Sequence, residues 1–236
     1  MLEDRGLSTV ALGAVRAQME KTRPPRGLWT SSQLGRPLGE PGDAAFQRRV
    51  LMAALGLLER TDGPVILEDF HDDPPGWSDN PAWSAPTVPP FGSLPTTPDG
   101  WECAFADELR HLMPAWRQAG TRFGRTTTGL SFQAPDAWPA FTSRVLGGDL
   151  PIVEGHETTA LALRFLCDDV KAFYGEVAQA DGPVPSSQQV DAWFWNGTIA
   201  GALLRALRVA ALESENNALK TVGGRFFVPA PWVAAG

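Results

Sequence analysis

The chain has 236 residues, of which 43% are hydrophobic and 20% are charged, so extended disorder is excluded. Its 27 acidic and 20 basic residues give a net charge of −7, which disfavours a nonspecific nucleic-acid-binding protein. No stretch approaches the roughly 18 consecutive apolar residues of a membrane span, and the acidic N-terminal residues do not resemble a secretory signal.

Residues 1–70 form the first predicted part, which alternates strands and helices. Strands are expected at 7–12, 26–30 and 65–67, and helices at 15–22 and 44–60. In the second helix Phe46, Val50 and Leu57 recur near helical spacing, and Asp43 is a suitable N-cap. This order predicts the α/β fold class, with a small parallel βαβαβ sheet and right-handed crossovers.

Residues 71–100 form a predicted proline-rich arm or linker. The segment holds eight prolines and has no helical or strand periodicity. Trp77, Trp83 and Phe91 are costly to leave in water, so we expect the arm to lie across a surface of this chain, of a second copy or of a protein partner. A flexible connection is the alternative interpretation.

Residues 101–236 form a third predicted part, which is mainly helical and rich in tryptophan. Helices are expected at 102–119, from 136 to about 147, at 157–180 and at 190–216, and an extended segment at 225–228. Pro114 should end or kink the first of these helices, because proline cannot donate the intrahelical hydrogen bond. The sequence therefore predicts a small N-terminal sheet followed by a mainly helical C-terminal part.

A glycine- and proline-rich loop joins the second predicted strand to the next helix. Gly35, Gly39 and Gly42 allow close backbone approach to a ligand, and the Arg36 guanidinium suits a carboxylate. In a parallel sheet this edge binds ligands, and a helix N-terminus favours an anion. We predict that these four residues bind an anion or a small substrate; a simple turn is the alternative.

An acidic run follows the third predicted strand and so belongs at the same sheet edge. Residues 68–73 contain four carboxylates and one imidazole, a set that suits a general base or a divalent cation. Consecutive side chains point in different directions, and no second ligand motif is adjacent, so a solvated acidic turn is the alternative. Glu68, Asp69 and His71 are the predicted catalytic residues, and no metal site is predicted.

The two cysteines are not predicted to form a reactive site. Cys167 lies on an apolar helix beside acidic residues, which raise a thiol pKa, and is interpreted as a buried structural residue. Cys103 lies near a helix start but has no base beside it. The pair shows no CxxC spacing and no disulfide framework, so we expect a cytoplasmic protein.

Two histidines of the helical part are interpreted as structural. His156 has no second histidine four residues later, which excludes the zinc-protease motif. His111 follows Glu108 by one turn on a predicted helix, a spacing typical of a surface pair. We therefore place the predicted chemistry at the sheet edge.

Four stretches within residues 6–70 resemble one protein family. They are GLSTV (6–10), RPPRGL (23–28), LGRPLGEPGD (34–43) and QRRVL (47–51). Together they resemble the C-terminal segment of the selenoprotein B family, which comprises the glycine, sarcosine and betaine reductases with D-proline reductase relatives. The resemblance implies an α/β frame with the loop from Gly35 to Gly42. It also implies reductive cleavage of a substrate C–N bond by a selenocysteine or cysteine upstream of this segment.

Two functional hypotheses follow from this resemblance. The chain has no cysteine before Cys103, so the family's nucleophile has no counterpart here. The first hypothesis is a small-molecule enzyme or enzyme subunit related to these reductases, acting on a small carboxylate or amino-acid-like substrate. The alternative is an inactive subunit that binds a separate chain carrying the missing half. The loop and the carboxylates converge on one edge, which favours the first, and the sequence identifies no cofactor.

Overall fold

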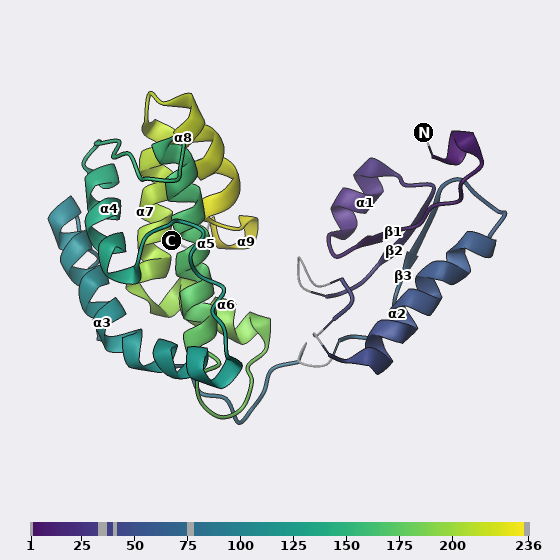
Figure 1. The fold of residues 1–236 in the computed structure, drawn as a ribbon, viewed down its shortest axis with the longest axis horizontal. Helices are drawn as coiled ribbons and strands as arrows, with labels where there is room; N and C mark the ends of the chain where they lie inside the picture. The colour runs from purple at the N-terminus through teal and green to yellow at the C-terminus, as the bar shows by residue number, and fades with distance from the viewer. Residues whose placement is uncertain (1, 33–36, 40–41, 75–77, 234–236) are drawn as a thin grey trace. The chain divides into compact units, whose positions relative to one another are not determined.

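The computed structural model describes residues 2–32, 37–39, 42–74 and 78–233. The chain divides into two compact units, Met1–Asp79 and Asn80–Gly236. The first contains a three-stranded parallel sheet and the second is helical (Figure 1), so the predicted fold class is confirmed. Among the helices in these ranges, none is long and apolar enough to cross a bilayer.

The first unit is an α/β unit whose strands follow one another in space in the order β1-β2-β3. Its elements are η1 (Glu3–Arg5), β1 (Ala11–Gly13), α1 (Arg16–Thr22), β2 (Arg26–Trp29), α2 (Ala44–Gly56), η2 (Leu57–Glu59) and β3 (Ile66–Asp69). All neighbouring strands are parallel, and Gly27 pairs with Leu67. The last row of the sheet, at its carboxyl edge, is Gly13, Trp29 and Asp69. The predicted βαβαβ order is therefore confirmed.

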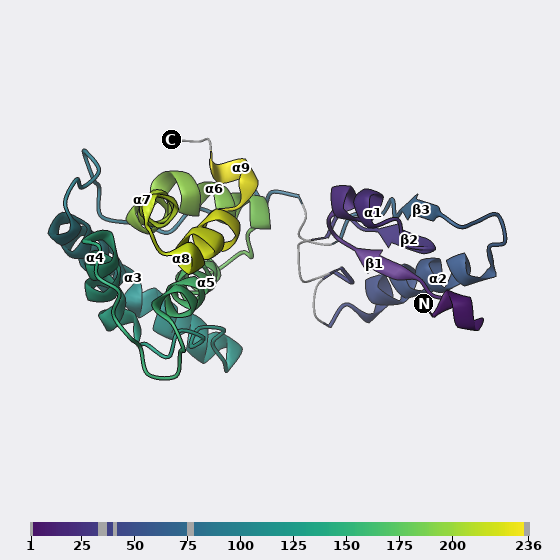
Figure 2. The ribbon, with the colours of Figure 1, turned by 90° about the horizontal axis from the view of Figure 1, so that it is seen from above.

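The two helices of the α/β unit cover opposite faces of the sheet (Figure 2). On one face Met19 of α1 lies so close to Gly13 and Gly27 that a Cβ at either glycine would clash with it. On the other face Phe46 of α2 packs with Leu28. Because the strand order is sequential, two crossovers of the same hand would place both helices on one face. The predicted right-handed form therefore holds for only one crossover.

The second unit is a helical unit that contains most of the buried apolar residues. Its elements are α3 (Pro98–Phe123), η3 (Pro135–Ala137), α4 (Trp138–Leu146), α5 (Thr159–Val177), α6 (Ser187–Gly197), α7 (Ile199–Glu213), α8 (Asn217–Val222), η4 (Gly223–Phe227) and α9 (Ala230–Val233). The core gathers side chains from α3 to α8, including the fully buried Trp138, Phe173 and Leu204. The arm joins this core at Trp83, whose indole N–H donates to the Ala178 carbonyl at 3.0 Å.

Three predictions for the helical unit are corrected. The expected helix at 190–216 is two helices, because Thr198 is extended and its hydroxyl binds both the Phe194 carbonyl and the Gly201 N–H. The expected helix at 102–119 is longer, since Thr97 caps it with Pro98 in its first turn, and it continues through Pro114 with a bend (Figure 1). The expected extended segment at 225–228 is mostly the π-helix η4.

Candidate functional site

The predicted anion-binding loop leads from β2 into α2 at the carboxyl edge of the sheet. Gly35 and Arg36 lie outside the described residues. Gly39 has φ +77° and lies so close to Phe46 that a Cβ would be 2.7 Å from its ring, so this position requires glycine. Gly42 has φ +89°, and the Asp43 carboxylate accepts the Phe46 N–H at 3.0 Å. The described part of the loop is therefore shaped to start α2, which is the turn given above as the alternative, and the predicted anion binding stays a prediction.

Glu68 and Asp69 point to opposite faces of the sheet, because successive side chains of a strand alternate. Asp69 lies on the α1 face at the carboxyl edge and accepts the Arg16 Nε–H at 3.0 and 3.1 Å. Glu68 lies on the α2 face and forms an ion pair with Arg60, which precedes β3. Arg60 also binds Asp62 and lowers the pKa of that carboxyl to about 2. The two predicted catalytic acids are therefore not brought together.

The acidic run continues beyond β3, and its side chains contact α2 and the loop after β2 near the carboxyl edge of the sheet. Asp72 accepts the Arg49 Nε–H at 3.1 Å, and Asp73 accepts the Ser31 hydroxyl at 2.7 Å. His71 is exposed, and its side chain has no hydrogen-bond partner among the described residues. The carboxylates thus serve as acceptors for basic and hydroxyl groups from α2 and the loop after β2.

Metal ligands do not converge in the part of the chain that the structure describes. No group of three or more His, Cys, Asp or Glu side chains suited to a metal ion occurs within those ranges. At the sheet edge the carboxylates of Asp69 and Asp72 are each occupied by a different arginine. The chemistry available to this edge is therefore exchange of ion-pair partners: an anionic ligand can take the place of a carboxylate on Arg16 or Arg49.

The two cysteines are both free thiols in the helical unit. Cys167 is fully buried on α5, and burial raises the pKa of its thiol to about 12. It is therefore protonated at neutral pH, in agreement with its predicted structural role. Cys103 is exposed on α3, and its side chain has no hydrogen-bond partner among the described residues.

A buried acid, Glu108, was predicted to lie in a surface pair but lies in the core of the helical unit, with 1% of its surface exposed. Its carboxylate accepts the Tyr174 hydroxyl at 2.5 Å and the N–H groups of Ile199 and Ala200 at 2.8 and 3.0 Å. Burial raises the pKa of Glu108 despite these hydrogen bonds. The carboxylate therefore joins α3, α5 and the start of α7 and is structural.

The sequence contains a signal for the burial of Glu108. Glu108 shares an apolar stripe with Phe105, Leu109 and Leu112, at the i, i+3, i+4 and i+7 spacing of a buried helix face. A charged residue on such a stripe is buried only when its polar atoms find partners. The nearby histidine suggested a surface pair, but the apolar neighbours were the better guide.

The comparisons with known proteins found no relative: no protein-family model, curated protein or solved structure matches the chain.

Proposed function

We propose that this chain is a subunit of a reductase-like enzyme related to the selenoprotein B-type reductases, and that its α/β unit binds a small carboxylate or an amino-acid-like molecule. The proposed site is the carboxyl edge of the sheet, next to the loop at residues 35–42. The main support is the charge arrangement there: Arg16 is paired with Asp69 and Glu20, and Arg49 is paired with Asp72, all in solvent-accessible ion pairs. A ligand carboxylate can replace such a partner at little cost, because exposed ion pairs are weak.

In the proposed reaction a separate chain supplies the nucleophile. The α/β unit contains no cysteine, and the thiol of Cys167 is buried and protonated. The acids of the sheet edge are engaged in ion pairs, so binding is the role that their geometry favours. Because both cysteines of the chain are free thiols, we place this function in the cytoplasm.

A catalytically inactive, partner-binding subunit is the second candidate function. Glu68 and Asp69 point to opposite faces of the sheet, and each is paired with an arginine. His71 has no carboxylate partner among the described residues that would orient it as a general base. Under this candidate the chain completes a separate catalytic chain, which it meets through the proline-rich arm.

Calorimetric titration of the purified chain with glycine, sarcosine and betaine tests the binding proposal. We expect Arg36→Ala to weaken binding by about 1.5–3 kcal/mol, the contribution of a hydrogen bond to a charged group. The matched control is Arg48→Ala, because Arg48 is exposed on α2 and forms no ion pair within the described ranges. Unchanged affinity in Arg36→Ala would remove Arg36 from the site.

Turnover and mass in solution separate the two candidate functions from a self-sufficient enzyme. We expect the chain alone to bind its ligand without turning it over, and a second chain bearing a thiol or selenol to restore reduction. A monomer that reduces one of these substrates on its own would refute the subunit proposal. If glycine, sarcosine and betaine all fail to bind while the chain still binds its protein partner, the inactive subunit is favoured.

A further inference from the structure

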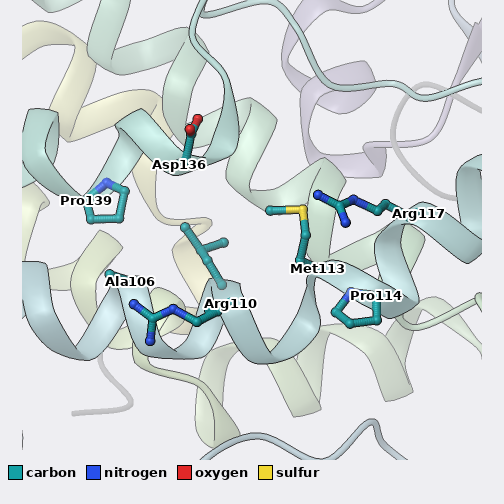
Figure 3. A pocket seen from close by; sticks show the side chains of 8 residues that line it. Ala106, Arg110, Met113, Pro114, Arg117, Asp136 and Pro139 are labelled. Atoms are coloured by element: carbon teal, nitrogen blue, oxygen red, sulfur yellow. The ribbon is translucent and has the colours of Figure 1, made fainter.

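The helical unit and the α/β unit each have an exposed surface that combines apolar and charged side chains. In the helical unit it is a pocket of about 380 Å³ between α3 and the η3–α4 segment (Figure 3). Its charged residues are Arg110, Arg117 and Asp136, and Figure 3 shows the Asp136 carboxylate directed away from Met113 and Arg117. These charges do not converge on one ligand group. On the outer face of α2, in contrast, the charges follow a regular order along the helix.

The outer face of α2 is apolar although it points away from the sheet. Phe46 and Val50 bury the inner face of this helix in the core of the α/β unit. The opposite side carries Leu51, Met52 and Leu55, which are 43%, 60% and 52% exposed. A helix on the surface of a protein usually carries polar side chains on that side. Exposed apolar side chains grouped in this way mark a surface that binds another protein.

One charged residue lies at each end of this apolar group. Arg48 lies on α2, and Glu59 lies in η2, which directly continues α2. Arg48, Met52, Leu55 and Glu59 follow the i, i+4, i+7 and i+11 spacing of one helix face. Both charged side chains are exposed, and neither forms a hydrogen bond or an ion pair with any described residue. The outer face therefore runs from a cation through apolar residues to an anion.

We propose that the outer face of α2 binds the same face of a second copy of this chain, with the two helices antiparallel. In a twofold interface, residue i of one copy contacts residue j of the other and j contacts i. Arg48 of each copy then pairs with Glu59 of the other, which gives one ion pair at each end. The apolar side chains of both copies meet between these pairs. A parallel arrangement would bring like charges together, so the order of the charges favours the antiparallel dimer.

The size of this face predicts a weak dimer. From Arg48 to Glu59 it covers about three helical turns, which is smaller than a standard interface with about 20–30 residues on each side. We therefore expect the dimer to form at high protein concentration and to dissociate on dilution. The inference goes beyond the proposed function, because it uses none of the residues assigned to the sheet-edge site.

Sedimentation of the full chain over a range of concentrations tests the apolar part of the interface. We expect the wild-type chain to dimerise and Leu55→Glu to abolish the dimer, because the carboxylate would be buried among apolar side chains. The matched control is Ile152→Glu, at a side chain of the helical unit that is 77% exposed, and it should leave the dimer unchanged. Circular dichroism should show that both variants fold, since both positions are exposed.

Reversal of the two charges tests the register. Arg48→Glu and Glu59→Arg should each weaken the dimer by about tenfold, because each change replaces two attractions by two repulsions. An equimolar mixture of the two variants should associate like the wild type, since every end of the mixed dimer then joins opposite charges. A wild-type chain that stays monomeric at all concentrations would mean that this face binds a different partner and would overturn the proposal. Two other results would also overturn it: a dimer that survives Leu55→Glu, or a mixture that associates no better than either charge variant alone.

Discussion

The two units of this chain differ in whether they bury carboxylates: the helical unit does, and the described part of the α/β unit does not. In the α/β unit Asp69 and Asp72 lie at the surface and meet arginine side chains. In the helical unit Glu108 and Asp169 are buried and accept backbone N–H groups, three of them at Asp169 from residues 129–131. Surface ion pairs exchange partners easily, whereas a buried carboxylate holds backbone in place. The exposed acids are therefore the ones that can respond to a ligand.

The apolar cores of the two units differ in size. The α/β unit buries a small cluster, centred on Phe46, Val50 and Leu28, between α2 and the sheet. The helical unit buries a much larger set that includes Trp138, with 0% of its surface exposed. A small unit depends more on each buried side chain, because its total stability is low.

The largest effect is expected for Phe46→Ala in the α/β unit. Phe46 packs against Gly39 and meets Phe70 edge to face at 5.9 Å, so its loss leaves a cavity in the small core. We expect a loss of about 3–5 kcal/mol, enough to unfold this unit while the helical unit stays folded. Hydrogen exchange should rise in residues 1–79 only. Met52→Ala, on the exposed side of α2, is the control and should change stability by less than about 0.5 kcal/mol.

Glu108→Ala should destabilise the helical unit by about 3 kcal/mol. The change leaves the Tyr174 hydroxyl and the N–H groups of Ile199 and Ala200 buried without an acceptor. Tyr174→Phe removes one donor and leaves the backbone contacts, so we expect about 1 kcal/mol. Urea unfolding measures both. Equal effects of the two variants would show that the backbone N–H groups find another acceptor.

The α/β unit follows from its local sequence pattern to a large extent. Three apolar runs separated by two helical patterns predict the parallel sheet, and Asp43 caps α2 as expected. Each of these signals acts over a few residues. The opposite faces of α1 and α2 could not be predicted in this way, because they depend on how Met19 meets Gly13 and Gly27 across the sheet.

The helical unit and the candidate site were predictable only in part. A break at Thr198 depends on a hydroxyl that binds backbone on both sides, which periodicity does not show. Likewise the ion pair between Arg16 and Asp69 joins residues far apart in sequence, so the neutralisation of the acidic run could not be predicted from the run itself.

The pH dependence of stability should also distinguish the units. Burial raises the folded-state pKa of Glu108, so its carboxyl binds a proton more tightly when folded. Its contribution is full below the unfolded-state pKa and is lost as pH rises through the folded-state pKa, with a slope of at most about 1.4 kcal/mol per pH unit. Urea unfolding of the helical unit at several pH values, with Glu108→Gln as reference, measures this. A wild-type slope equal to that of the variant would contradict it.

The smallest change in stability, and the sharpest test of the sheet edge, is expected for Asp69→Asn. Its ion pair with Arg16 is about one-third exposed at the acid and nearly half exposed at the base, so we expect a loss of under about 1 kcal/mol. The same change removes one of the two carboxylates that bind Arg16 and leaves only Glu20, so glycine or betaine should bind more tightly at the carboxyl edge. Glu68→Gln is the matched control, because it removes one of the two carboxylates that bind Arg60 on the other face, where Asp62 remains, and it should leave binding unchanged. Tighter binding in both variants would mean that net charge, rather than the position of Arg16, governs affinity.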